Sequence, residues 1–177
     1  IVKPFQRISP KISCLSDGIK NVYEKELLIE KSNLYVTPNG VNTSKFVTRD
    51  PKYPDRSLYL AKIDYRKRQS MFQSISSLYY AGNNADPNFN TNINYLGEWS
   101  KEHLYNNLTD YGNLVLLSDG EAHPLVCMEA LAAGLGVVVC EYGAANLDTT
   151  KEFITVIPES KITDLKYLEE EIIKNRE

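Results

Sequence analysis

Several kinds of residue are scarce in this chain, and each scarcity excludes a class of protein. The 177 residues include three cysteines, two histidines and one tryptophan, and 20 lysines and arginines against 23 aspartates and glutamates give a net charge of −3. Without a basic excess the chain cannot neutralise a row of phosphates, so we expect no nucleic-acid partner. The apolar runs are short, as in residues 135–140, and none approaches the roughly 20 residues needed to span a bilayer.

The cysteines do not form a framework of any kind. Cys14, Cys127 and Cys140 lie in apolar segments without C-x-x-C spacing, which is typical of buried free thiols rather than of disulfides or a zinc site. We therefore expect no metal centre and a reducing compartment, the cytoplasm. Hydrophobic residues at 42% and charged residues at 24% are instead the composition of a globular chain with a sizeable core.

Apolar strands alternate with helical segments along the chain. The pattern predicts strands at 34–36, 58–63, 78–81, 93–96, 114–117, 136–140 and 153–157, and helices at 17–30, 68–76, 100–107, 124–133 and 163–175. The strands are apolar throughout, which favours a parallel sheet covered on both faces. Residues 47–57 and the Asn-rich residues 83–92 have no such pattern and are predicted loops, the second one in place of a helix. The predicted fold class is α/β, a Rossmann-like doubly wound parallel sheet.

Two glutamates stand beside the predicted helix at 124–133, where ligands bind in such sheets. Glu121 precedes this helix, and Glu129 lies more than one turn inside it among apolar neighbours. A carboxylate on an apolar face is costly to bury unless something binds it, and a diol could do so. The alternative is a surface glutamate paired with a nearby lysine, and the residues alone leave both open.

Four cations follow the predicted strand at 58–63. Lys62, Arg66, Lys67 and Arg68 fall within seven positions. Alone they are most simply a solvated cluster. Across a crevice from a helix N-terminus, the same cations would cradle a diphosphate.

These segments together resemble a known family. Residues 118–134 read SDGEAHPLVCMEALAAG, which resembles the E-x7-E signature of retaining GT-B glycosyltransferases of the group 1 family. In the same order, VTPNGVN at 36–42 with Phe46, LYLAK at 58–62 with Lys67, and LGEW at 96–99 resemble the family's hinge, diphosphate loop and base loop. The resemblance implies that residues 1–40 are the end of an N-terminal domain and a hinge, and that residues 41–177 are the Rossmann-like, donor-binding C-terminal half of a GT-B fold.

The resemblance also implies a role for each matching residue. Glu129 would accept hydrogen bonds from the ribose hydroxyls of a nucleoside-diphosphate sugar, with UDP among the candidate carriers, and Glu121 would lie near the transferred sugar. Lys67 and Lys62 would neutralise the leaving diphosphate, so that neither metal nor other cofactor is required. The remaining donor contacts that it implies are the backbone around Pro124, Leu125 and Val126, the base beside Trp99, the sugar near His123, and Arg66 in support of the diphosphate.

Two departures from the family keep alternatives open. The usual Gly-Arg is Ala61-Lys62 here, and lysine lacks the bidentate fork of arginine. Nothing before Ser13 resembles the acceptor half, so we expect it elsewhere in a longer polypeptide or in a separate chain; the acceptor (glycan, lipid or protein) is open, and peripheral membrane contact is expected only through that half. A degenerate nucleotide-binding or assembly module is the alternative function. A dehydrogenase-like nucleotide binder is a weaker one, because G-x-G-x-x-G is absent.

Overall fold

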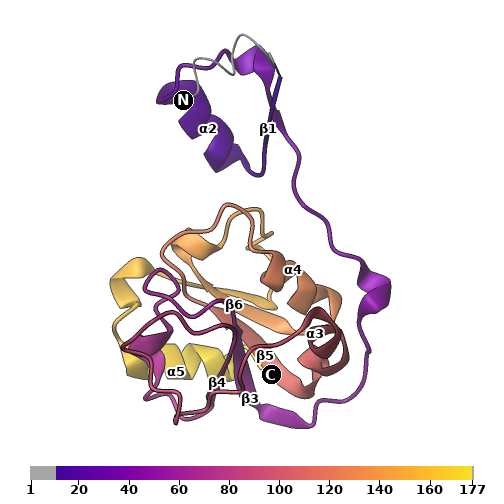
Figure 1. Cartoon of the computed structure of the whole chain (residues 1–177), viewed down its shortest axis with the longest axis vertical. Helices are drawn as coiled ribbons and strands as arrows, with labels where there is room; N and C mark the ends of the chain where they lie inside the picture. The colour runs from indigo at the N-terminus through magenta and orange to yellow at the C-terminus, as the bar shows by residue number, and fades with distance from the viewer. Residues whose placement is uncertain (1–10, 177) are drawn as a thin grey trace. The chain divides into compact units, whose positions relative to one another are not determined.

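The computed structural model describes residues 11–176 (Figure 1). The chain divides into two compact units at the junction between Gly40 and Val41. The hinge predicted from the sequence ends at the same position. The assignment of the first segment to a preceding domain stays a prediction, and its first ten residues lie outside the described residues. No helix within residues 11–176 is long and apolar enough to cross a membrane.

The first unit is a small β-α-β element. Strand β1 (Ile12–Cys14) pairs in parallel with β2 (Leu34–Val36), and helix α2 (Asp17–Lys25) connects them. The side chain of Ser16 accepts a hydrogen bond from the backbone N–H of Ile19, as expected of an N-cap. The predicted helix at 17–30 ends early, because the backbone of Leu28 turns into the left-handed region at φ 52°, which a continuing helix cannot adopt.

The second unit is built on five parallel strands in the order β4-β3-β5-β6-β7. Their bounds are β3 (Tyr53–Leu60), β4 (Leu78–Ala81), β5 (Tyr111–Leu116), β6 (Gly136–Cys140) and β7 (Ile154–Ile157). The core lies along β5 and β6, where residues 113–117 and 137–140 are almost fully buried. The predicted α/β fold class is confirmed.

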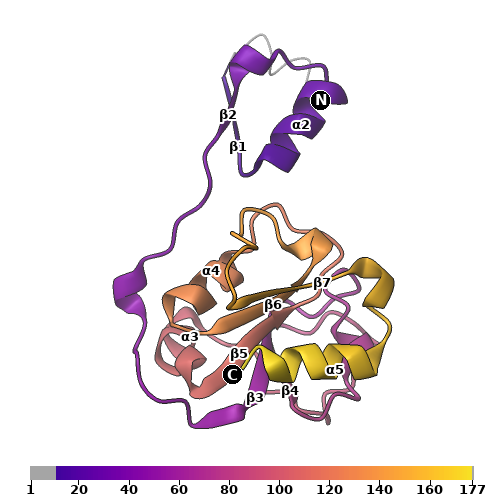
Figure 2. The same ribbon diagram turned by 180° about the vertical axis from the view of Figure 1, so that it is seen from behind.

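Helices cover both faces of this sheet. On one face, α3 (Lys101–Asn107) and α4 (Leu125–Ala132) pack over β5 and β6. On the other, Figure 2 shows α5 (Leu165–Lys174) in front of the strands. The α5 helix is attached there by the side-chain amide of Asn113, which donates to the carbonyl of Ile172 at 2.9 Å. This layering is what exposes the carboxyl edge of the sheet to a ligand.

Other predicted elements also differ from the structure in kind or extent. Residues 93–96 form no strand, only a single parallel bridge between Tyr80 and Tyr95, because Asn94 adopts a left-handed φ of 49°. The helix predicted at 68–76 is a short 3-10 turn, Gln69–Phe72. Strand β3 begins at Tyr53, inside the predicted loop at 47–57, and ends at Leu60. The loop predicted at 83–92 is confirmed, since those described residues hold no helix.

Candidate functional site

The strand order reverses between β3 and β5. From β3 the chain moves outward to β4, then returns to place β5 on the other side of β3. In doubly wound sheets, ligands bind at the carboxyl ends of the strands flanking such a switch point. Here those ends lead into residues 61–68 and 117–124, the two loops in which the sequence analysis places most of the site.

The loop after β3 is shaped by an aspartate. The Oδ1 atom of Asp64 accepts hydrogen bonds from the backbone N–H groups of Arg66 and Lys67, each at 3.1 Å. The backbone N–H of Lys67 also donates to the carbonyl of Asp64 at 3.0 Å. This Asx turn fixes the backbone from which the cations project.

The two loops are tied together through their backbones. The N–H of Asp119 donates to the carbonyl of Arg66 at 2.7 Å. Beneath them, the hydroxyl of Tyr59 donates to the carbonyl of Lys67 and accepts from the N–H of Leu117. Burial raises the pKa of the Tyr59 hydroxyl well above its usual value, so the hydroxyl keeps the proton that it donates.

Lys67 and Glu121 meet where these loops join. The ammonium of Lys67 forms an ion pair with Oε1 of Glu121, and the hydroxyl of Ser118 donates to the same oxygen at 2.7 Å. The Glu121 backbone N–H donates to the carbonyl of Tyr142 at 3.0 Å. Both charged side chains are partly accessible, at 21% and 15% exposure, so the pair is anchored and can still be reached from solvent.

The other two predicted cations lie at the same edge with fewer constraints. A guanidinium nitrogen of Arg66 is 3.4 Å from the carbonyl oxygen of Gly120. Lys62 is 60% exposed, and its ammonium is 3.9 Å from Asp64. Lys62 also lines the cavity that holds Glu129, whereas Arg66 and Lys67 contact the loop after β5.

Glu129 lies inside the fold rather than on its surface. It is 6% exposed and contributes to a cavity of about 360 Å³ that is also lined by Leu60, Trp99, Leu104 and Val126. The ammonium of Lys101 lies 2.6 Å from its Oε1 atom, and that lysine side chain is 66% exposed. The structure thus combines parts of both expectations, because the carboxylate is buried beside a cavity and is also paired with a lysine.

The first turn of α4 faces the same region. Pro124 occupies the N-cap position, and no side chain caps the N–H groups that follow it. Leu125 and Val126 line the cavity that holds Glu129. Uncapped N–H groups and the positive end of the helix dipole suit an anion there.

The aromatic residues near the site differ in accessibility. Trp99 lines the cavity, and its ring packs on His103 at 4.6 Å between centroids and on Tyr111 at 6.0 Å. His103 is exposed. His123, directly before Pro124, is buried at 8% exposure, so little of its side chain is open to a sugar.

Sequence reasoning missed two residues that shape the site. Tyr59 reads as an ordinary core aromatic, although a buried tyrosine hydroxyl in a central strand usually needs a polar partner. Lys101 reads as a surface cation in the first turn of α3, and no local signal ties it to Glu129. Among residues 11–176, no cluster of three histidine, cysteine, aspartate or glutamate side chains could hold a metal ion.

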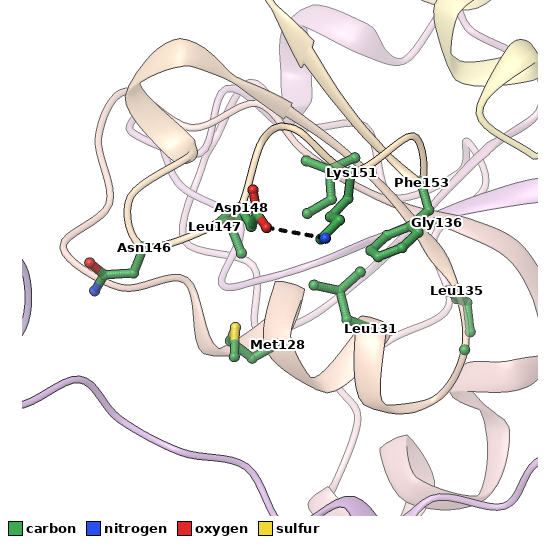
Figure 3. Close-up of a pocket in the computed structure, with 11 residues that line it drawn as sticks. Met128, Leu131, Leu135, Gly136, Asn146, Leu147, Asp148, Lys151 and Phe153 are labelled. Carbon is green, nitrogen blue, oxygen red and sulfur yellow. Dashed lines mark ion pairs between the residues drawn. The ribbon is translucent and has the colours of Figure 1, made fainter.

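A second cavity lies on the opposite side of α4. Its volume is about 530 Å³, and Figure 3 shows Leu131 and Leu135 facing Phe153 across it, with Met128 at one side. Asp148 and Lys151 form an exposed ion pair of 3.5 Å at its rim. None of the site residues predicted from the sequence lines it, so this second cavity is separate from the candidate site.

Comparisons with known proteins agree with the geometry at the level of the fold. No protein-family model and no curated protein sequence matches the chain. Among solved structures, the chain is similar to Staphylococcus aureus TarM in complex with UDP and other ligands, with 15% identity, a TM-score of 0.73, and coverage of 94% of this chain and 36% of that one.

Two further structures show the same likeness. The lipopolysaccharide outer core galactosyltransferase WaaB matches at 18% identity and a TM-score of 0.71, over 94% of this chain and 54% of that one. Anabaena HepE, in complex with UDP and glucose, matches at 11% identity and a TM-score of 0.68, over 93% of this chain and 53% of that one. The chain thus spans about half or less of these relatives' lengths. At such identities the likeness shows the fold alone, the Rossmann-like C-terminal half of a GT-B glycosyltransferase fold.

Proposed function

We propose that this chain is the donor-binding domain of a retaining, metal-independent glycosyltransferase that passes a sugar from a nucleoside diphosphate to an acceptor hydroxyl. The observation that carries the proposal is the ion pair of Lys67 and Glu121 at the switch point, together with a cavity at the same carboxyl edge of the sheet that is lined by the buried Glu129. The acceptor half would be supplied by an N-terminal domain of the same or another chain.

The cavity beside α4 would hold the nucleoside. Its base would lie against Trp99, and the two ribose hydroxyls would donate to Glu129, whose position inside the cavity leaves room for a diol. Binding would displace the ammonium of Lys101 from the carboxylate. The ribose hydroxyls would take over the hydrogen bonds to the carboxylate, which is 8% exposed, and the ammonium of Lys101, whose side chain is 66% exposed, would return to water.

The diphosphate would extend toward the start of α4. There the uncapped N–H groups near Leu125 and Val126 would face it on one side, with Lys62, Lys67 and Arg66 on the other. In transfer, the bond from the anomeric carbon to the diphosphate oxygen breaks, the acceptor oxygen bonds to that carbon, and the hydroxyl proton is released. The charge that develops on the diphosphate would be stabilised by these cations and by the helix dipole.

Glu121 would then face the transferred sugar. Its carboxylate is fixed by Ser118 and Lys67, so it would offer an oriented acceptor for sugar hydroxyls and a negative charge close to an oxocarbenium-like carbon. Two structural relatives were solved with UDP bound, which supports UDP as the first nucleotide to test.

One observation favours the alternative of a non-catalytic module. Both glutamates already have a cation from the chain itself, Lys67 for Glu121 and Lys101 for Glu129. A site that satisfies its own charges could serve as a rigid assembly surface without a donor.

Calorimetric titration of the chain with UDP, GDP, ADP and TDP, without metal, separates these functions. We expect one nucleotide to bind with a Kd between about 1 μM and 1 mM. Glu129→Ala should weaken it at least tenfold, because hydrogen bonds to charged groups are worth about 1.5–3 kcal/mol each. Lys101→Met is the matched control: it removes the partner of Glu129 but leaves the carboxylate, and should change the Kd less than threefold.

The opposite pattern supports the module. If a folded sample binds none of the four nucleotides, or if Glu129→Ala binds as tightly as the unchanged chain, the donor site is not where we propose it. With an acceptor half supplied, Glu121→Gln should abolish transfer while leaving the Kd for the nucleotide within about threefold.

A further inference from the structure

Arg68 has a backbone conformation that is unusual for its residue type. Its φ is 57° and its ψ 14°, in the left-handed region. Glycine adopts this region without steric conflict, whereas a residue with a Cβ rarely does so. A residue that keeps such a conformation at the edge of a ligand site points to a constraint imposed by its side chain.

The side chain of Arg68 is held by two carboxylates. One guanidinium nitrogen lies 3.2 and 3.0 Å from the two oxygens of Glu159, and the other lies 2.7 Å from Asp119. The side chain is 15% exposed and that of Glu159 18%. Asp119 is 54% exposed, but because its partner is the second nitrogen of the same planar guanidinium, the two contacts together fix the orientation of the Arg68 side chain more firmly than a single exposed ion pair would.

These contacts join the loops at the carboxyl ends of three strands. Arg68 belongs to the loop after β3, Asp119 to the loop after β5, and Glu159 to the turn after β7. The loop after β6 is attached as well, since the backbone N–H of Glu159 donates to the Glu141 carboxylate at 2.9 Å. One guanidinium therefore links the loops that frame the switch point.

The positions in the chain connect this linkage to the proposed chemistry. Arg68 directly follows Lys67, and Asp119 lies two residues before Glu121. The same Asp119 donates its backbone N–H to Arg66 at 2.7 Å. A contact from Arg68 to Asp119 thus fixes the loop that carries the ammonium against the loop that carries the carboxylate.

We propose that Arg68 is a positioning residue, whose guanidinium clamps the loops after β3, β5 and β7 and so holds Lys67 and Glu121 at the spacing that a nucleoside diphosphate requires. The part that concerns nucleotide rests on the function proposed above. Arg68 itself need not touch the ligand, because it acts through the two loops.

Three variants test the clamp. Arg68→Gly relieves the left-handed strain and removes the guanidinium, and Arg68→Lys keeps a charge but not the fork. Arg49→Gln is the control. It removes a different ion pair, in which a guanidinium nitrogen of Arg49 lies 2.7 Å from Asp110. Asp110 directly precedes β5, so this pair lies at the amino edge of the sheet, opposite to the loops after the strands.

Two measurements are made on each variant. Amide hydrogen exchange of the free chain reports on residues 64–68 and 118–122, and titration with UDP, or whichever nucleoside diphosphate the unchanged chain binds, gives the Kd. We expect Arg68→Gly to speed exchange in both segments at least tenfold and to raise the Kd at least tenfold. Arg68→Lys should give exchange rates and a Kd between those of Arg68→Gly and the unchanged chain. Arg49→Gln should leave the exchange rates and the Kd within twofold of those of the unchanged chain.

The outcomes separate the two proposals. Unchanged exchange in both segments in Arg68→Gly overturns the clamp, as does an equal rise in the Kd for Arg49→Gln, which would indicate a general loss of stability. Faster exchange with an unchanged Kd overturns the role in nucleotide binding. If the unchanged chain binds no nucleotide, the proposed function and that role both fail, while the exchange of the free chain still decides whether Arg68 holds the loops.

Discussion

The buried hydroxyl of Tyr59 donates its hydrogen bond to the backbone carbonyl of Lys67. It also accepts from the N–H of Leu117 at 2.9 Å, so one side chain in the central strand supports both loops of the candidate site. The side chain is fully buried, and water cannot replace these bonds without disturbing the core. The loops are therefore fixed from below by Tyr59 and from above by the pair of Lys67 and Glu121.

The Tyr59→Phe substitution should lower the free energy of unfolding by about 1–3 kcal/mol, because it leaves the buried N–H of Leu117 without its partner. Urea-induced unfolding followed by circular dichroism measures the change. Tyr80→Phe is the matched control. Its side chain is also fully buried and lies in the neighbouring strand, but its hydroxyl has no hydrogen-bond partner among residues 11–176. We expect the Tyr80→Phe substitution to leave the free energy of unfolding unchanged or to raise it. An equal decrease in the free energy of unfolding of both variants would contradict the assigned role of Tyr59.

Gly82 should tolerate no side chain. Its φ is +142°, and a Cβ there would lie 1.9 Å from the carbonyl oxygen of Ala61, inside van der Waals contact. At Gly97, whose φ is +81°, an added Cβ would meet no other atom within 4 Å. In thermal unfolding, Gly97→Ala should cost about 1–2 kcal/mol through backbone strain alone, and Gly82→Ala at least about 2 kcal/mol more. Similar losses in the two variants would show that the close approach of Gly82 to Ala61 is wrong.

The two cysteines of the second unit should not react in the folded chain. Burial raises the pKa of the Cys140 thiol to about 12 and also raises that of the Cys127 thiol above its usual value. Because a raised pKa keeps the thiol protonated at pH 8, the reactive thiolate is depleted about a thousandfold against a free cysteine of pKa about 8.5. Labelling with a disulfide reagent at pH 8 should modify both residues only after guanidinium is added. Rapid labelling of either in the native chain would contradict this burial.

Local patterns were sufficient for the elements whose signals are local. The α4 helix has a proline at its start and a glycine after its end, and it was predicted to within one residue of its observed bounds. The strand near Leu114 was predicted from its continuous apolar run, but β5 begins three residues earlier, at Tyr111. The start of β3 was missed because Tyr53 pairs with Tyr111 of β5 in an exposed, irregular stretch. That pairing is a tertiary interaction with no sequence signal of its own.

The site divides in the same way. Glu121, Glu129 and Lys67 were proposed from the family resemblance together with their positions beside a predicted helix and a predicted strand, and their roles stay predictions. The partner of Glu129 could not be identified from the sequence, since Lys101 lies 28 residues away and reaches the carboxylate only because α3 packs beside α4. The clamp formed by Arg68 likewise depends on Glu159, which is 91 residues distant in the chain.

The most direct test of the account is where a nucleoside diphosphate binds. Amide hydrogen exchange of the chain, with and without a saturating concentration of the nucleotide that it binds, maps the contact. We predict protection in residues 98–104 and 118–129, which surround Trp99, Glu121 and Glu129, and none in residues 146–154 around the second cavity. Protection confined to 146–154 would place the ligand on the far side of α4 and would contradict the proposed donor site.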